Sequence, residues 1–312
     1  MVRWLKSVMA DPTATLEKPT NVDETLWAQR HVSESRRVLQ QFLKRRMAVV
    51  GLLVIVIEIV VIIAAPLLVA YDPIEVSMAD RFLPPSAGHM MGTDELGRDL
   101  FTRVLYGGRI SLLVGLFSVL LGMSMGVPLG LLSGYAGGFV DEAIMRFIDV
   151  LLSFPGMLLA IVIVATLGPS TVNVVIAVAI FSTPTFARVV RGATLSIKEF
   201  TYVEAARCTG AGHARIMLKH ILPNVLSLVL VLFSLNIGMA IISATGLNFI
   251  GLGGRPPSPE WGLMLSSGRG YLRHEWWVAT FPGLAILITV LGLNLLGDGL
   301  RDALDPRIRK SR

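Results

Sequence analysis

Long apolar runs separated by short polar segments dominate this sequence. A membrane-spanning helix takes about 20 mainly apolar residues. Six runs meet or approach that requirement: 48–70, 111–132, 148–168, 172–187, 225–245 and 278–297. Only Gly168-Pro169-Ser170, a combination typical of turns, separates the third run from the fourth. The pattern therefore predicts an all-α membrane protein with six transmembrane helices.

Lysine and arginine residues are distributed unevenly between the segments that connect these runs. If the N-terminus lies inside, 21 of the 28 fall in inner segments and 7 in outer segments. Cytoplasmic segments of membrane proteins carry an excess of positive charge, so this bias predicts that both termini are cytoplasmic. Topology then accounts for the net charge of +6, which gives no reason to expect a nucleic-acid partner.

The composition supports a membrane protein and offers no sign of an enzyme. Charged residues make up 16% of the chain, against about 25% in soluble proteins. The sequence has no G-x-x-x-x-G-K-[ST] loop and no H-E-x-x-H motif, and its five histidines are scattered. The single cysteine, Cys208, allows neither an internal disulfide nor a cysteine-based metal site. We therefore expect no catalytic residue, no metal site and no cofactor on this chain.

Small residues recur at every fourth position of the second run. They are Ser118, Gly122, Gly126, Gly130 and Gly134. This spacing places them on one helix face, which another backbone can approach closely. Two roles are open for this stripe: packing within the chain, or a helix that lines or moves around a transport pathway.

A single carboxyl group, Glu58, lies in the middle of the first run. An ionisable residue inside a membrane is costly and marks a functional site by default. The other runs offer no matching acid or base, so no proton relay is indicated. Three roles stay open: a neutral or hydrogen-bonded structural group, a contact with a partner helix, or a part in transport.

The polar segment between the fourth and fifth runs predicts two short helices joined by a turn. Residues 200–208 contain good helix formers, and Gly210 and Gly212 allow a sharp turn. Residues 213–221 can form the second helix, before Pro223 opens the fifth span. The segment is either an amphipathic loop on lipid headgroups or a rigid knob that transmits a push from a soluble partner.

This segment resembles the EAA signature of permease subunits in binding-protein-dependent ABC importers. The resemblance rests on Glu204-Ala205-Ala206, Gly210 and Leu222-Pro223 at the spacing of that family. His220 stands where the general pattern has an apolar residue, but HILPN (220–224) is similar to the peptide branch. Four further stretches resemble dipeptide and oligopeptide permeases of the C type: 92–115, 134–161, 247–265 and 281–306.

The resemblance covers residues 35–310 and implies a type I importer permease with the MetI-like fold, in the bacterial inner membrane. It implies that loop 200–222 docks on an ATP-binding subunit. The implied coupling residues are Glu204, Ala205, Ala206, Gly210, His220, Leu222 and Pro223. The implied partners are a second homologous permease chain, two ATP-binding subunits that hold ATP and magnesium, an extracytoplasmic solute-binding protein and the lipid bilayer.

Two long outer segments, 72–110 and 247–277, are rich in proline and glycine. We interpret part of the second as a docking surface for the solute-binding protein. The candidate docking residues are Arg255, Pro256, Pro257, Glu260 and Trp261. Arg255 stands where the family has glutamine, so its contact is not carried over from the family. No substrate-binding residue is indicated.

The resemblance makes di- or oligopeptides the expected substrates, with glutathione, nickel complexes and oligosaccharides as alternatives. A secondary transporter that uses Glu58 and a structural membrane protein are the alternatives from other classes. The predicted organisation is a cytoplasmic arm (1–46), a first helix with its outer segment (47–110), a permease core (111–300) and a cytoplasmic tail (301–312).

Overall fold

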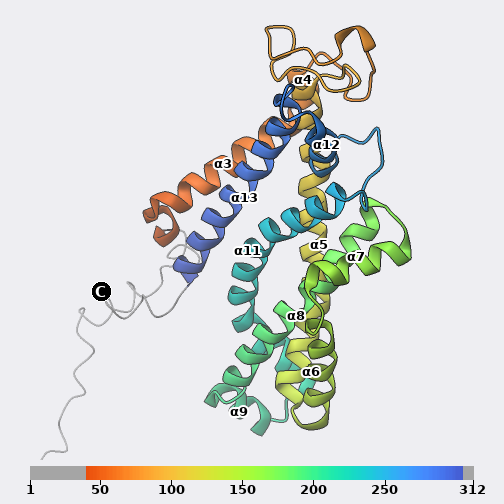
Figure 1. The fold of residues 1–312 in the computed structure, drawn as a ribbon. Coiled ribbons are helices and arrows are strands. Elements are labelled where there is room, and N and C mark those ends of the chain that lie inside the picture. Colours follow the sequence, from red (N-terminus) through yellow and green to blue (C-terminus); the bar gives the residue numbers. More distant parts are fainter. Residues whose placement is uncertain (1–39, 305–312) are drawn as a thin grey trace, which may run out of the picture. The chain divides into compact units, whose positions relative to one another are not determined.

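In the computed structural model, the described residues are 40–304, and every regular element among them is a helix (Figure 1). Most of the predicted cytoplasmic arm and most of the predicted tail lie outside the described residues. Within 40–304, five helices are long and apolar enough to cross a membrane, or six if one bent pair counts as a single span.

The first predicted run forms α3, Arg46–Ile63, followed by α4, Ala65–Leu68. The break between them falls just before Pro66, whose ring removes a backbone donor. Helix α3 packs along α13, Trp277–Leu304 (Figure 1). The backbones are close, because a Cβ on Gly51 would lie 2.8 Å from the carbonyl oxygen of Gly292.

The second predicted run is part of α5, Leu100–Ala136, which has 37 residues and begins well before the predicted start at residue 111. Asp99 caps its N-terminus by accepting the backbone N–H of Thr102 at 2.8 Å. The helix is longer than the apolar run within it, because Arg103 and Arg109 interrupt the apolar pattern without interrupting the helix. Gly137, at φ 67°, ends it.

The third predicted run is not one straight span. It forms α6, Gly138–Leu152, and α7, Gly156–Leu167, which are bent by 87° relative to each other. The prediction of a single helix over 148–168 was wrong, because Pro155 at the break cannot continue α6 and disfavours a helical conformation of the residue before it.

The predicted turn between the third and fourth runs is confirmed. Helix α7 ends at Gly168, which has φ 92°, and α8, Thr171–Ile197, follows. The side chain of Ser170 caps α8 by accepting the backbone N–H of Asn173 at 3.1 Å. Helix α8 contains Pro184 and extends ten residues past the predicted end at 187.

The polar segment contains α9, Thr201–Cys208, and then α10, His213–Ile216. The sequence predicted a second short helix over 213–221 that is separate from the fifth span. This prediction was wrong, because α10 continues through a π-helical turn, Met217–Ile221, into α11, Leu222–Phe249. The wider π turn precedes Pro223, whose ring crowds the preceding helical turn. The remaining elements are α12, Trp261–Gly268, and 3-10 turns at Met78–Asp80 and Arg269–Tyr271.

The stripe of small residues in α5 packs against α8, and these two helices form the most extensive helix pair within residues 40–304. A Cβ on Gly126 would lie 2.6 Å from the carbonyl oxygen of Thr183, and one on Gly130 would lie 2.4 Å from that of Ala187. The backbones therefore touch, and packing within the chain is the role that the structure supports for this stripe.

Candidate functional site

Helix α9 has one buried side and one exposed side. Val203 is fully buried and Ala206 is partly buried, whereas Glu204 and Ala205 are exposed. The exposed side of α9 therefore presents one carboxylate beside a small residue, and a second molecule can approach it closely.

Gly210 forms the turn that follows α9. Its φ is 80°, and no atom lies within 4 Å of the position of a Cβ, so conformation and not space requires glycine here. The Gly210 N–H donates to the Arg207 carbonyl at 2.9 Å, and the Ala211 N–H donates to the Ala206 carbonyl at 3.0 Å. These two bonds form a Schellman motif, which satisfies the last carbonyls of α9 and fixes the direction of the chain.

The C-terminal part of the candidate coupling loop is held by a second set of contacts. The carbonyl oxygen of His220 accepts the Asn224 side-chain amide at 2.7 Å and the Tyr202 hydroxyl at 3.3 Å. Leu222 is partly buried and Pro223 is exposed at the start of α11. Tyr202 and Asn224 thus join α9 to α11, although neither residue was predicted from the sequence to have a role.

A buried apolar cluster joins the loop to the long helices. Val203, Ile216 and Ile221 come from the loop. Leu131 of α5 and Val190 of α8 complete the contact, and all five side chains are at most 6% exposed. Because close-packed side chains transmit displacement, a force on α9 acts on α5, α8 and α11 together. This geometry favours a rigid knob over a loop that rests on lipid.

Ion pairs join α6 to α8 near the same end of the helices. The guanidinium of Arg191 donates two hydrogen bonds of 2.6 Å to Asp141, one to each carboxylate oxygen. Arg188 donates to Asp149 at 2.6 Å. Neither pair was predicted from the sequence, because nothing in the linear pattern indicates that α6 folds back along α8.

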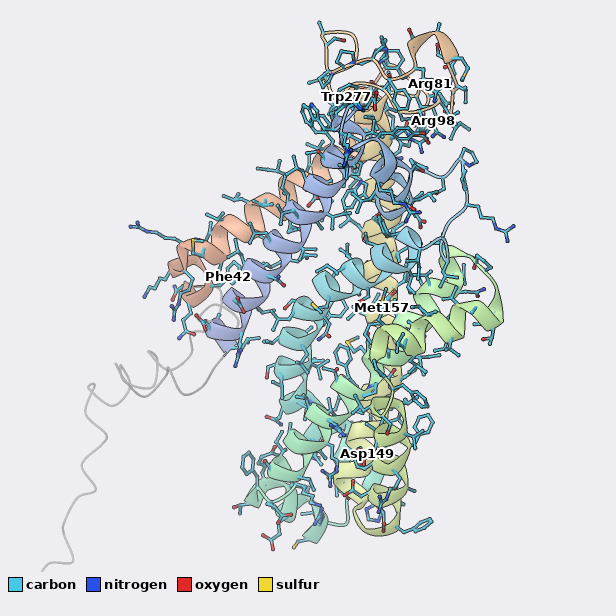
Figure 2. All side chains as sticks on the ribbon, in the orientation of Figure 1. Phe42, Arg81, Arg98, Asp149, Met157 and Trp277 are labelled. Carbon is cyan, nitrogen blue, oxygen red and sulfur yellow. The ribbon has the colours of Figure 1, made fainter. Side chains whose placement is uncertain are left out.

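Arg98 and Trp277 lie at the opposite end of the helices from Asp149 (Figure 2). The candidate docking segment contacts the start of α5, which follows Arg98, through hydrogen bonds of Pro257 and Trp261. Arg255, Pro256 and Pro257 are exposed, as a docking surface requires. Glu260 and Trp261 are buried, so in this conformation they hold the segment in place and offer no surface to a partner.

Two hydrogen bonds explain how Glu260 holds the segment. Its carboxylate accepts the Thr171 hydroxyl at 3.1 Å and the Gly254 N–H at 3.2 Å. Burial raises the pKa of Glu260, and these two hydrogen bonds oppose that rise. Trp261 donates its indole N–H to the Val104 carbonyl at 2.8 Å, which fixes α12 against α5.

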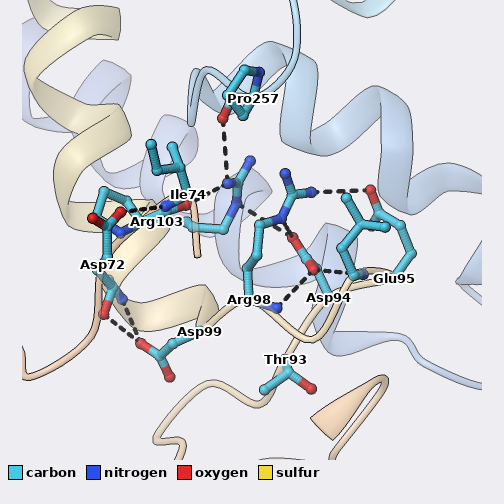
Figure 3. A network of polar contacts seen from close by, with 12 residues as sticks. Asp72, Ile74, Thr93, Asp94, Glu95, Arg98, Asp99, Arg103 and Pro257 are labelled. Atoms are coloured by element: carbon cyan, nitrogen blue, oxygen red, sulfur yellow. Dashed lines mark hydrogen bonds and ion pairs between the residues drawn. The ribbon is translucent and has the colours of Figure 1, made fainter. Parts of the chain in front are cut away.

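A polar cluster lies beside this segment (Figure 3). Asp94 accepts the Nε–H of Arg98 at 2.7 Å, and its carboxylate lies 3.4 Å from Nε of Arg103. Arg103 also donates to the carbonyl oxygens of Pro73 and Pro257 at 2.6 and 3.4 Å. Asp94 and Arg98 belong to the stretch 92–99 (GTDELGRD), and Arg103 lies in the first turn of α5, which follows it.

Glu58 forms a hydrogen bond with a neighbouring helix. Its Oε1 accepts from the hydroxyl of Thr289 on α13, and its Oε2 is buried with no hydrogen-bond partner among residues 40–304. This contact supports a hydrogen-bonded structural role for Glu58. Thr289 also donates to the Ala285 carbonyl at 2.8 Å, so it shares one proton between two acceptors.

The long apolar helices, with a polar loop at one end and a folded polar segment at the other, define a multi-pass membrane protein. Residues 126–310 match the family described as "Binding-protein-dependent transport system inner membrane component". Residues 33–85 match the "N-terminal TM domain of oligopeptide transport permease C". The chain belongs to this family of inner-membrane permeases of ABC importers.

Two curated relatives cover most of the chain. It is 51% identical over 275 residues to a glutathione transport system permease protein, GsiD, of Pectobacterium atrosepticum, covering 88% of this chain and 91% of that protein. It is 44% identical over 305 residues to a dipeptide transport system permease protein, DppC, of Alkalihalophilus pseudofirmus, covering 98% and 100%.

Among solved structures, the inward-facing MetNI methionine ABC transporter has a similar fold. The TM-score is 0.55 at 20% sequence identity, and the alignment covers 66% of this chain and 98% of that chain. This likeness concerns the fold alone, and it agrees with the all-α, MetI-like permease fold predicted from the sequence.

Proposed function

We propose that this chain is one of two permease subunits of an ATP-driven importer of small peptides, and that it lines the translocation pathway together with a second, homologous chain. The proposed topology has six spans, with α6 and α7 forming one of them, and both termini in the cytoplasm. Loop 200–222 then faces the cytoplasm, and segment 247–277 faces outward. ATP and magnesium are held by two separate ATP-binding subunits, so this chain itself performs no hydrolysis.

One observation carries the coupling role. The exposed face of α9, with Glu204 and Ala205, is backed by the buried cluster that reaches α5, α8 and α11. Docking of an ATP-binding subunit on this face would move three long helices as one body when the two ATP-binding subunits close. Gly210 sets the turn, and His220, Leu222 and Pro223 fix the start of α11, which completes the proposed coupling site.

The substrate class rests on the relatives. The two relatives described above have printed names that specify glutathione and dipeptides. Glutathione is itself a tripeptide, so both names describe small, zwitterionic peptide-like solutes. We propose this class for the present chain, with di- or oligopeptides first and glutathione as the alternative, delivered by an extracytoplasmic solute-binding protein.

The test begins with purification of the chain from its native membrane in mild detergent. Recovery with a second permease chain and ATP-binding subunits is expected, and recovery alone would contradict the proposal. In proteoliposomes, Ala205→Glu is expected to abolish ATP-driven uptake of radiolabelled dipeptide or glutathione, because a charged side chain fills the docking face. Ala205→Ser, which keeps a small side chain, is the matched control and should retain uptake.

A further inference from the structure

A small cavity lies between two outer segments that are far apart in the sequence. One wall comes from residues 94–103 and the other from residues 256–267, and the cavity volume is about 200 Å³. Arg98 and Arg103 line the first wall, and Ser258 and Ser267 lie on the second. Leu263 and Met264 of α12 form the rest of the second wall, and Val278 of α13 also lines the cavity.

Arg98 and Arg103 have more N–H donors than the neighbouring residues accept in hydrogen bonds. Their side chains are 5% and 4% exposed. Each guanidinium has five N–H donors. Arg98 donates to Asp94 and Glu95, and Arg103 donates through Nη1 to two backbone carbonyls. Nε of Arg103 is buried and makes no hydrogen bond within the part of the chain that the structure describes.

The two acids of the cluster differ in how firmly they are held. The carboxylate of Asp94 is held in place by several hydrogen bonds, because its Oδ1 also accepts the backbone N–H groups of Leu96 and Arg98 at 2.9 and 3.0 Å. Glu95 is held by one bond of 3.3 Å to Nη2 of Arg98, and its side chain is 21% exposed. Glu95 is therefore the acid that another carboxylate can replace.

We propose that this cavity receives one acidic side chain of the solute-binding protein when that protein docks on the outer face. The inference rests on the proposed function and names the contact chemistry of the docking surface. The incoming carboxylate accepts hydrogen bonds from the guanidinium of Arg98, and Glu95 swings out to solvent. Arginine suits this role, because its planar guanidinium binds a carboxylate through two parallel bonds.

The size and position of the cavity favour a protein side chain over the transported solute. Ligand pockets for whole small molecules measure about 300–1,000 Å³, whereas this cavity of about 200 Å³ suits one carboxylate group. Pro256 and Ser258, which line it, belong to the candidate docking segment, and Pro256 is exposed beside the cavity. A docking protein that covers this exposed segment would thus meet the cavity directly.

The test uses the complete transporter in nanodiscs and the purified solute-binding protein that supports its uptake, with association and dissociation rates measured by biolayer interferometry. Arg98→Gln is expected to raise the dissociation rate about tenfold or more, because it removes the buried donor of a charged pair. Glu95→Gln is expected to lower the dissociation rate about threefold or more, because an amide competes less well than a carboxylate for Arg98.

Two matched controls separate the cavity from general electrostatics. Arg273→Gln and Glu75→Gln remove the same charges from exposed outer positions outside the cavity. Each should change mainly the association rate, by less than about threefold, and this change should vanish at high salt. The effects at Arg98 and Glu95 should persist at high salt, because the pair is buried.

The proposal is falsifiable because it expects Arg98→Gln to raise the dissociation rate and Glu95→Gln to lower it. If both variants weaken binding, the cluster is a structural network only, and if neither changes it, the cavity is not a contact. If Arg98→Gln fails to assemble, the dissociation rate of Glu95→Gln alone tests the proposal. This variant should keep the fold, because Glu95 is partly exposed and glutamine has nearly the same shape. Wild-type transporter that neither binds the protein nor shows ATP-driven uptake would instead refute the proposed function.

Discussion

The contact between α5 and α8 gives the sharpest test of this architecture. In Gly130→Ala, the new Cβ would lie 2.4 Å from the Ala187 carbonyl oxygen and 2.9 Å from Cβ of Val190. Ordinary contacts begin near 3.4 Å, and the nearest atom is backbone, which cannot rotate away. The two helices must therefore separate locally by about 1 Å, which is the kind of overpacking strain that costs about 1–3 kcal/mol.

Gly192→Ala is the matched control for this substitution. Gly192 lies in α8, and no atom lies within 4 Å of the position of its Cβ. Replacing a helical glycine by alanine stabilises a helix by about 1 kcal/mol, and that gain is common to both variants. Their difference in stability therefore isolates the packing, and we expect Gly130→Ala to be less stable than Gly192→Ala by about 1–3 kcal/mol.

The assay measures the thermal stability of the purified transporter, which is monitored by fluorescence-detected size-exclusion chromatography after heating. Gly130→Ala should melt below the wild type or near it, and Gly192→Ala should melt above it. Equal melting temperatures for the two variants would show that α5 and α8 are not in backbone contact at Gly130, and the explanation of the small-residue stripe would fail.

Three further outcomes are expected. Gly210→Pro should abolish ATP-driven uptake, because proline cannot adopt the φ of 80°, while Gly210→Asn should retain it, since asparagine tolerates this region; equal uptake by both would contradict the turn. Glu58→Gln should assemble and transport normally, because its amide oxygen still accepts from Thr289, and loss of uptake would give the carboxyl group a role in transport. Burial raises the pKa of Glu260, so its contribution to stability is largest at low pH and falls as the pH rises through the raised value. Glu260→Gln should therefore gain thermal stability over the wild type as the pH rises above the ordinary glutamate pKa of about 4.3, and a difference that does not change with pH would refute this.

The sequence by itself located the apolar runs that form five long helices, α3, α5, α8, α11 and α13, and it located the turn at Gly168. This was possible because the length of an apolar run is a local property that the bilayer thickness fixes. The turn in the candidate coupling loop 200–222 could also be predicted, since its glycine and proline residues restrict the local backbone. The turn at Gly210 and the exposed positions of Glu204 and Ala205 agree with that expectation.

Tertiary structure decided what each apolar face touches. Lipid and protein interior are equally apolar, so hydropathy cannot tell a lipid-facing residue from one packed against another helix. The small-residue stripe of α5 was therefore left with two possible roles until α8 was seen against it. The sharp bend after α6 followed from Pro155, a residue that a count of apolar positions treats as a minor interruption.

The polar clusters depended most on the fold. Arg103 donates a hydrogen bond to Pro257, which is 154 positions away in the sequence, and Thr171 donates one to Glu260, which is 89 positions away. No periodicity links residues at such separations, so their partners could not be predicted from one sequence. Burial of Glu260 and Trp261 within the candidate docking segment, and the cavity beside Arg98, exist only because long-range packing brings the two outer segments together.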